Sequence, residues 1–322
     1  MMAGLFDPHL PTRVLFVGGG QDSVALLMLC QHDIGFRETF LGKSNFCALM
    51  TDTGIEYQET EEYVSWLKQW CPTVGIDFTF VTPDMGFHGA TWQSLTDQME
   101  RNNNIMGVTF AKSCTDNLKI KVSYRFLAQW LRDHYGYRGN DPSVFYQYRH
   151  YFGKLVSWIG FAAGEESRVA HPGPKTPAEP DEYVLFQEGD TGPAYIPKWR
   201  KLCVEHRYPL LELGHDRAAC QRIIAVYGYP IPYPSNCMFC PFQNEVEIVY
   251  LYRTHPDRWQ QWVERKAAKL AKFAQSKVNH GVKGKLALPQ YLKKALEKYG
   301  HWSVEQLREY RFSHGHCVVS KY

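Results

Sequence analysis

Residues 14–23 read VLFVGGGQDS and lead directly into the apolar run VALLMLC at residues 24–30. The β-branched and aromatic residues 14–17 predict a buried strand, and the run after the glycines predicts a helix. Three successive glycines allow a tight turn, after which the first backbone amides of the helix are free to bind an anion such as a phosphate. The pattern is not the GxxxxGK[ST] phosphate loop, since no lysine follows the glycines, and an ordinary glycine-rich turn of an α/β domain is the alternative.

A second strand-to-helix unit follows. Residues 46–50 (FCALM) predict another buried strand, and residues 58–71 predict a helix with apolar side chains at helical spacing. Asp52-Thr53-Gly54 stand between the two, and Glu59-Thr60 open the helix. Taken alone, Asp-Thr-Gly is an ordinary turn before a helix cap. Because both turns follow predicted parallel strands, they are expected at the sheet edge where ligands of such folds bind.

Both turns resemble parts of known nucleotide-binding families. Residues 18–23 resemble the SGGxDS pyrophosphate loop of the N-type ATP pyrophosphatases, or PP-loop family, with Gly18 at the serine position. Residues 52–60 resemble the adenine-nucleotide site of the reductases for 3′-phosphoadenosine 5′-phosphosulfate (PAPS) and their relatives. The resemblance implies that the first loop holds phosphates and that the second turn holds the adenosine half. The nucleotide-binding residues implied are Gly18, Gly19, Gly20, Gln21, Asp22, Ser23, Asp52, Thr53 and Gly54.

Predicted strands and helices alternate along residues 13–162. Further strands are predicted at 77–82 and 155–160, and further helices at 91–103 and 118–134. This alternation predicts an α/β fold with a doubly wound parallel sheet, and the resemblance implies the adenine nucleotide α-hydrolase-like version of it. We expect a nucleotide-binding core at 1–162, a Pro/Gly-rich loop or lid at 163–204, a cysteine-cluster region at 205–250 and a basic helical tail at 251–322.

The composition describes a globular protein. With 322 residues, 44% of them hydrophobic and 15% aromatic, the chain can bury a large core. No stretch is long and apolar enough to span a membrane, and the N-terminus lacks a secretory pattern, so we expect a cytoplasmic protein. The nine cysteines are then expected to be reduced, metal-bound or catalytic.

The formal net charge of +3 conceals an asymmetry. Residues 251–300 contain twelve Lys and Arg against three Asp and Glu, including Lys266, Lys269 and Lys272 on a predicted helix. This excess predicts a phosphate-rich partner such as a nucleic acid. A solvated lysine-rich surface helix is the alternative.

The motif Cys237-Met238-Phe239-Cys240 brings two thiolates close enough to hold a metal, with a redox pair as the alternative. This motif and residues 113–120 (SCTDNLKI) resemble iron–sulfur PAPS/APS reductases and the sulfur-inserting subunit of DNA phosphorothioation systems. The resemblance implies a [4Fe–4S] cluster, and four-thiolate zinc is the alternative. The implied ligands are Cys114, Cys220, Cys237 and Cys240, with Cys203 as the substitute for Cys114, while Cys30, Cys47 and Cys71 are expected in the core.

Three more positions follow from the resemblance. Lys119 is expected to face the nucleotide phosphates. Residues 160–168 (GFAAGEESR) resemble a GIRxxES-type segment with Ala162 at the arginine position, which leaves Arg168 as an anion contact or a surface charge. Cys317 stands where PAPS reductases carry a nucleophilic tail cysteine, and the histidines beside it would favour the thiolate. The surrounding ECG motif is missing, so a tail cysteine without a role is the alternative.

The resemblance implies an ATP pyrophosphatase that adenylates an acceptor, with Mg²⁺ on the phosphates, and that transfers sulfur to a nucleic acid or otherwise modifies it. A sulfur donor protein is a further expected partner. The first alternative is a PAPS or APS reductase, and the second is a nucleotide-binding module without catalysis, since Gln21 replaces the family's lysine. The residues expected to act in catalysis are Asp22, Ser23, Lys119 and Cys317.

Overall fold

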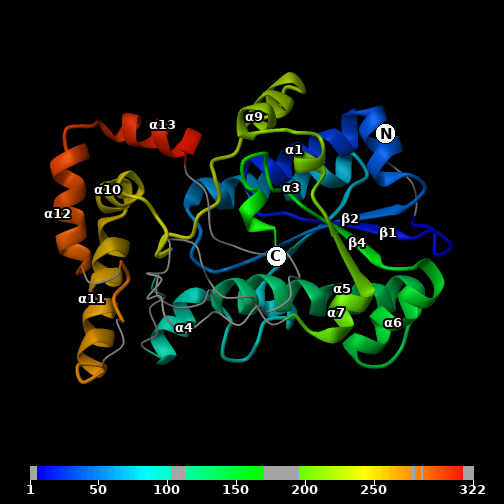
Figure 1. Ribbon diagram of the computed structural model, residues 1–322, viewed down its shortest axis with the longest axis horizontal. Helices are drawn as coiled ribbons and strands as arrows, with labels where there is room; N and C mark the ends of the chain where they lie inside the picture. The colour runs from blue at the N-terminus through cyan, green and yellow to red at the C-terminus, as the bar shows by residue number, and fades with distance from the viewer. Residues whose placement is uncertain are drawn as a thin grey trace, which may run out of the picture.

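The computed structural model describes residues 6–102, 107, 113–169, 196–276, 280–283 and 286–314. These residues form a five-stranded parallel sheet in the order β3-β2-β1-β4-β5. Helices cover both faces of the sheet (Figure 1), which confirms the predicted α/β doubly wound fold. The strands are β1 (Thr12–Phe16), β2 (Asn45–Thr51), β3 (Asp77–Val81), β4 (Leu155–Ile159) and β5 (Val204–Arg207).

The central strand β1 marks the point where the strand order reverses. The chain builds β2 and β3 on one side of β1 and then β4 and β5 on the other. Leu15 of β1 stands in register with Ala48 of β2 and with Trp158 of β4. The connections after β1 and β4 therefore diverge, and a crevice forms at the carboxyl ends of these strands.

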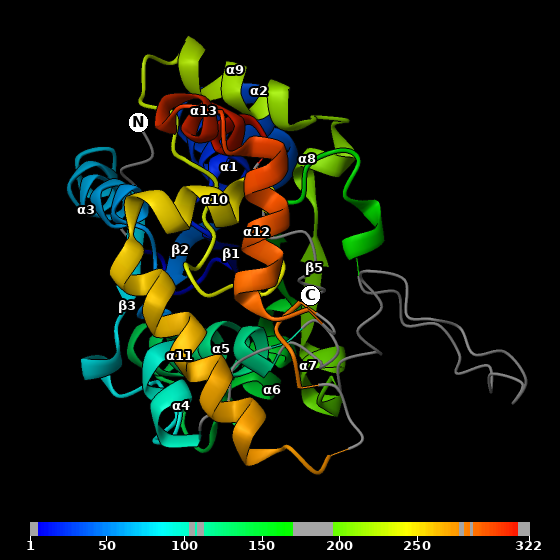
Figure 2. The same ribbon diagram turned by 90° about the vertical axis from the view of Figure 1, so that its left-hand side faces the viewer.

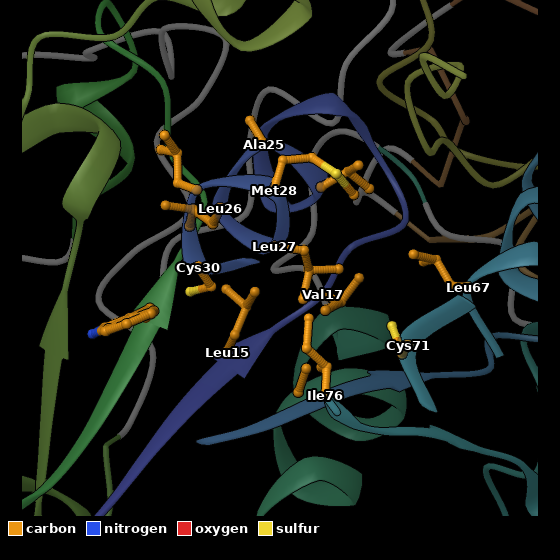
Figure 3. Packing of buried hydrophobic residues seen from close by; sticks show 14 of the residues in the cluster. Leu15, Val17, Ala25, Leu26, Leu27, Met28, Cys30, Leu67, Cys71 and Ile76 are labelled. Carbon is orange, nitrogen blue, oxygen red and sulfur yellow. The ribbon is translucent and has the colours of Figure 1, made fainter. Parts of the chain in front are cut away.

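Two layers of helices enclose the sheet (Figure 1). Leu15 and Val17 pack against Leu26 and Leu27 of the first helix (Figure 3), and all four side chains are buried. This apolar contact fixes where the glycine turn must lie, because it anchors the segments on both sides of the turn. One layer contains α1 (Gln21–His32), α3 (Gln58–Thr73), α8 (Pro209–Glu212) and α9 (Arg217–Val226), and the other contains α5 (Lys121–Tyr135), α6 (Asp141–Phe152) and α7 (Lys198–Cys203).

The remaining elements of this part of the chain are short turns and helices. The helix predicted at 118–134 begins as a π-helical turn, Thr115–Ile120, which continues into α5. Such turns are rare and frequently occur at functional sites, and this one contains Lys119. The others are α2 (Ile34–Phe36), a π-helical turn (Arg37–Leu41), α4 (Leu95–Asn102) and two 3₁₀ turns (Pro83–Met85 and Glu166–Arg168).

A helical module stands beside the sheet and its two helical layers (Figures 1 and 2). Its buried side chains, among them Val249, Trp262 and Leu292, form a cluster separate from those on the sheet. Tyr57 and Leu118 join this cluster from the α/β part. The predicted C-terminal helical region is therefore present. Its helices are α10 (Glu245–Thr254), α11 (Pro256–Lys272), α12 (Leu288–Tyr299) and α13 (Val304–His314). Among the described helices, none has the length and apolar character needed to cross a membrane.

The α/β core extends farther along the chain than residue 162, the boundary that we predicted. Strand β5 pairs with β4, and α7, α8 and α9 join the layers on the sheet. A four-residue edge strand with charged and polar residues has little of the apolar pattern that reveals a buried strand. Residues 170–195, the centre of the expected lid, lie outside the described residues.

Candidate functional site

A cavity opens at the carboxyl ends of β1, β2, β4 and β5, in the crevice beside the central strand. The glycine turn, the π-helical turn before α5, and α7 all contribute to its wall. A concentration of positive charge in a recess of this kind favours an anionic ligand. The cationic residues that line the cavity are Lys119, Arg168, Arg200 and Arg217, and the His206 ring lines it as well.

The glycine loop, residues 18–20, is braced by the first turn of α1. Gly19 has a φ of +76°, which residues with a Cβ rarely adopt. The Ser23 hydroxyl accepts a hydrogen bond from the Gly18 amide at 3.1 Å and donates one to the Gly20 carbonyl at 3.2 Å. The residue before α1 is Gly20, which has no side chain with which to cap the first amides of the helix. Gly18 and Gly20 line the cavity. Because the Gly18 amide is already bonded to Ser23, an anion there meets the amide of Gly20 and those of the first turn of α1.

The end of β4 closes against this loop at Gly160. A Cβ at this position would stand 2.8 Å from the backbone nitrogen of Ser23 and 3.1 Å from the carbonyl carbon of Asp22. Only glycine allows the two backbones to approach so closely. The cavity wall between β1 and β4 therefore depends on a residue that contributes no side chain.

Gln21 is a structural clip. Its side chain is 2% exposed, and its Nε2 donates to the carbonyls of Pro232 at 3.0 Å and Phe312 at 3.1 Å. Its Oε1 accepts from Nε2 of Gln221 at 3.0 Å. Gln21 therefore ties the glycine loop to α9, to the segment before α10 and to α13.

Asp22 and Arg168 belong to one chain of ion pairs. Arg217 lies 3.2 Å from Oδ2 of Asp22 and 3.5 Å from Oε1 of Glu165, whose other oxygen lies 2.8 Å from Arg168. The guanidinium of Arg168 also stands 4.1 Å from the ring centroid of Phe161. Burial raises the pKa of the Asp22 carboxyl, and the charge of Arg217 opposes that rise. Sequence reasoning missed Arg217, which no motif marks.

The Asp-Thr-Gly turn lies beside the cavity rather than in its wall. Oδ1 of Asp52 accepts from the Gly54 amide at 2.7 Å, and the Thr53 hydroxyl donates to Oε1 of Glu56 at 2.6 Å. These hydrogen bonds shape the turn. The preceding Thr51 does line the cavity, whereas residues 52–54 are absent from the described lining.

Sequence reasoning also missed Arg200 and His206. Arg200 is 7% exposed, and its guanidinium carbon lies 5.4 Å from the ring centroid of Tyr124. Nδ1 of His206 lies 2.6 Å from the Ser157 hydroxyl, and burial, followed by the charge of Arg200, lowers the pKa of His206 to about 4. Arg200 lies in the basic run 198–201, which is typical of a surface. Had residues 204–207 been assigned to the sheet, His206 would have been expected at the carboxyl end of a strand, and Arg200 on the helix just before it.

Cys237 lies where the helical module meets the second turn. The Cys240 amide donates to the Cys237 carbonyl at 3.1 Å, which forms the turn that holds both cysteines. Sγ of Cys237 stands 3.4 Å from the hydroxyl of Thr53. Burial raises the pKa of the Cys237 thiol, the nearby Lys119 opposes this, and Cys114 adds to it. The structure thus brings Cys114 and Lys119 close to Cys237.

Cys220 lies apart from these cysteines. It is fully buried on α9 in the hydrophobic core beside α1, where its thiol is hydrogen-bonded to Asp22. Cys237 and Cys114 pack instead against the core of the helical module. Within the described part of the chain, no group of three or more Cys, His, Asp or Glu side chains is placed to hold a metal ion.

The residues as arranged therefore do not fit the implied four-thiolate site, because Cys220 belongs to a different core. A [4Fe–4S] cluster or a zinc ion stays a prediction from the sequence. Cys203, the substitute ligand, is buried beside α5. Cys30, Cys47 and Cys71 are fully buried core residues, as expected. Cys317 lies outside the described residues.

No protein-family model matches the chain, and no curated protein matches it. Among solved structures, the chain is similar to the U34-tRNA thiolase NcsA from Methanococcus maripaludis with its [4Fe-4S] cluster. The sequence identity is 14%, the match covers 91% of this chain and 84% of that one, and the TM-score is 0.34.

Proposed function

We propose that this protein is an enzyme of the PP-loop ATP pyrophosphatase type, which binds an adenine nucleotide and adenylates an acceptor for sulfur transfer or nucleic-acid modification. One observation carries the proposal. A braced glycine loop with open amides shares a cavity with Lys119, Arg168 and Arg217 at the point where the strand order reverses. Amides together with cations suit a chain of phosphates, and this edge of a doubly wound sheet is where such folds bind nucleotides.

In the proposed reaction, the loop amides bind the β- and γ-phosphates of ATP, which enters with Mg²⁺. An acceptor oxygen attacks the α-phosphorus, so that a new O–P bond forms and the bond to pyrophosphate breaks. Pyrophosphate leaves with the bonding electron pair. Lys119 and Arg168 stabilise the charge that develops on the phosphates. A sulfur nucleophile then displaces AMP from the acceptor, while Asp22 holds Arg217 in position.

The test compares ATP binding by the wild type and by Gly19→Val, measured by isothermal titration. A Cβ at Gly19 would stand 2.8 Å from Cε of Met50, and φ at this position is unfavourable for valine, so we expect binding to be lost. Gly35→Ala is the control, because Gly35 is not part of the described cavity lining and a Cβ there meets only Oδ1 of Asp33 at 3.4 Å. Circular dichroism verifies that each variant folds. Equal affinity of the wild type and a folded Gly19→Val for ATP would show that the loop is not part of the nucleotide site.

Product analysis separates the alternatives. Release of AMP and pyrophosphate from ATP in the presence of tRNA or DNA supports the proposal. Release of sulfite and adenosine 3′,5′-bisphosphate from PAPS would instead identify a sulfonucleotide reductase, for which Cys317 would be the nucleophile. Nucleotide binding with neither product would leave a binding module without catalysis.

For a nucleic-acid acceptor, the basic surface of the helical module is the candidate docking face. Fewer of its lysines are exposed than the sequence predicted. Lys266 and Lys269 are each 3% exposed, and Nζ of Lys266 donates to the Leu286 carbonyl at 2.7 Å. Burial lowers the pKa of Lys266 to about 8. Lys293 and Lys294 on α12 are exposed, so they are the better candidates for phosphate contacts.

Charge reversal at Lys293 and Lys294 should weaken binding to tRNA and DNA of every sequence alike. The slope of log K against log[salt] should become less steep by about 0.7–0.9 for each phosphate that the protein no longer neutralises. Lys298→Glu is the control, since Lys298 is already paired with Glu245 at 2.8 Å. Failure of the wild type to bind nucleic acid at low salt would make a small-molecule acceptor the better proposal.

A further inference from the structure

We propose that Arg200 and His206 form a second anion-binding subsite, which receives an oxyanion of the co-substrate while the glycine loop holds the nucleotide phosphates. The inference rests on the proposed function in one respect, because that function places the nucleotide in the other half of the cavity. The two residues come from neighbouring elements, α7 and β5, and both line the cavity.

Arg200 carries a charge that the protein does not balance within the described chain. Its Nε is buried without a hydrogen-bond partner, and no carboxylate in the described chain pairs with it. Arg168 and Arg217 in the same cavity are both paired with carboxylates. Glu165 pairs with both arginines, and Asp22 also pairs with Arg217. A buried guanidinium without a counter-charge destabilises the protein. An anionic ligand that supplies the missing negative charge would explain why Arg200 is buried at this position.

Arg200 and the glycine loop belong to different parts of the fold. β5 lies two strands from β1, which is roughly 10 Å at the usual spacing of strands. Arg200 comes from the layer that contains α5, whereas the loop leads into α1 on the opposite face (Figure 1). Because Arg200 and the loop reach the cavity from opposite faces of the sheet, we assign a different group of the ligands to each.

The chemistry of the Arg200 and His206 side chains suits an oxyanion. The planar guanidinium matches two oxygens of a phosphate or a carboxylate, and the ring of Tyr124 stands beside it. The Ser157 hydroxyl lies nearer Nδ1 of His206 (2.6 Å) than the Glu205 carbonyl (3.3 Å), so we assign it as the donor to Nδ1. The ring proton is then on Nε2, which makes no hydrogen bond in the described chain. The depressed pKa of His206 keeps the ring neutral at physiological pH. The subsite thus offers one fixed positive charge and one neutral polar atom to a single oxyanion.

The experiment titrates inorganic phosphate, and separately acetate, into the full-length protein saturated with ATP. Binding is followed by the melting temperature and by the Hε1 resonance of His206. We expect Arg200→Gln to weaken phosphate binding by roughly tenfold or more, because the variant cannot form a charge-assisted pair. The same variant should melt higher than the wild type without phosphate, since it removes an unpaired buried charge. The matched control is Lys201→Gln, one residue along the same helix and exposed.

Phosphate that shifts the melting temperature and the His206 resonance equally in the wild type and in Arg200→Gln would overturn the proposal. So would a lower melting temperature of Arg200→Gln without phosphate, since that would assign Arg200 a structural role against Tyr124. Preference for phosphate over acetate identifies a phosphoryl group, and the reverse preference identifies a carboxylate. Should ATP fail to bind, the proposed function falls, while phosphate binding abolished in Arg200→Gln alone would still support the subsite.

Discussion

At the scale of single residues, the site depends on close approaches of backbone atoms. Gly160 touches the first turn of α1, and Ser23 braces the glycine loop with two hydrogen bonds. Both contacts set the position of the loop amides that the proposed anion would meet, so small displacements here should change the affinity for the nucleotide.

Gly160→Ala should therefore lower both stability and ATP affinity. The added methyl group would stand 2.8 Å from the Ser23 nitrogen, so a backbone segment must move. We expect a loss of about 1–3 kcal/mol in the free energy of unfolding, as is usual for overpacking. Denaturant unfolding and ATP titration measure the two effects. An unchanged affinity would show that the loop tolerates displacement.

His206 gives a pH prediction with a definite sign. Its pKa is about 4 in the folded protein, below the ordinary 6.5, so the unfolded chain binds more protons between these values. The stability from the neutral ring is complete above pH 6.5 and is lost as the pH falls toward 4, by at most roughly 3 kcal/mol. His206→Asn should remove this part of the loss. Urea unfolding of both proteins at several pH values measures it, and parallel curves would contradict the assignment.

The sequence could predict the residues that carry a recognisable pattern. Gly18, Gly20, Asp22 and Ser23 line the cavity, as do Lys119 and Arg168. Arg200, His206 and Arg217 could not be predicted, because they reach the cavity through the folding of β5 and its flanking helices. Each is a common residue type without a motif, and only the sheet order brings it to the site.

At the scale of elements, α13 is bound to the loop side of the molecule by buried polar contacts. Arg311 is fully buried, stands 3.7 Å from the ring centroid of Tyr57 and lies 3.5 Å from Oε1 of Glu59. The Phe312 carbonyl then accepts from Gln21. The last described helix therefore supports the first turn of the first helix.

Gln21→Leu tests this support. The substitution leaves the carbonyls of Pro232 and Phe312 and the amide of Gln221 without their partner, at a cost of about 1–3 kcal/mol for each buried group left unsatisfied. We expect amide hydrogen exchange in α13 to accelerate. Gln31→Leu is the control on the same helix, because Oε1 of Gln31 is buried without a partner. Equal exchange in both variants would mean that Arg311 alone holds α13.

Elements with a strong apolar period were predictable, and the others were not. The strands β1 to β4 and the helices α1, α3 and α5 follow from their own residues. β5 is short and polar, so its place depends on pairing with β4 rather than on its own sequence. The π-helical turn before α5 differs from an α-helix by hydrogen-bond register, which side-chain periodicity does not record.

At the scale of the whole molecule, the described chain consists of a layered α/β core and a helical module with separate hydrophobic interiors. Cys237 and Cys114 lie against the interior of the module, and Cys220 lies in that of the core. A metal centre shared by all of them would have to cross this division.

Metal analysis of anaerobically purified protein tests the consequence. Whatever iron or zinc the protein binds, Cys220→Ser should retain it, because the Cys220 thiol is committed to the core beside Asp22. Cys237→Ser and Cys240→Ser should lower the metal content. Visible absorbance near 400 nm would distinguish an iron–sulfur cluster from zinc. Loss of metal in Cys220→Ser would restore the four-cysteine site predicted from the sequence.

The clip at Gln21 also has a consequence for biosynthesis. Residues 18–21 leave the ribosome long before Gln221, Pro232 and Phe312, the three partners that hold the clip. A nascent chain therefore carries the loop sequence for most of its translation without the contacts that fix it. The proposed nucleotide site should therefore be completed late, when α13 has been made. ATP captured by stalled chains of increasing length would record when the site is assembled.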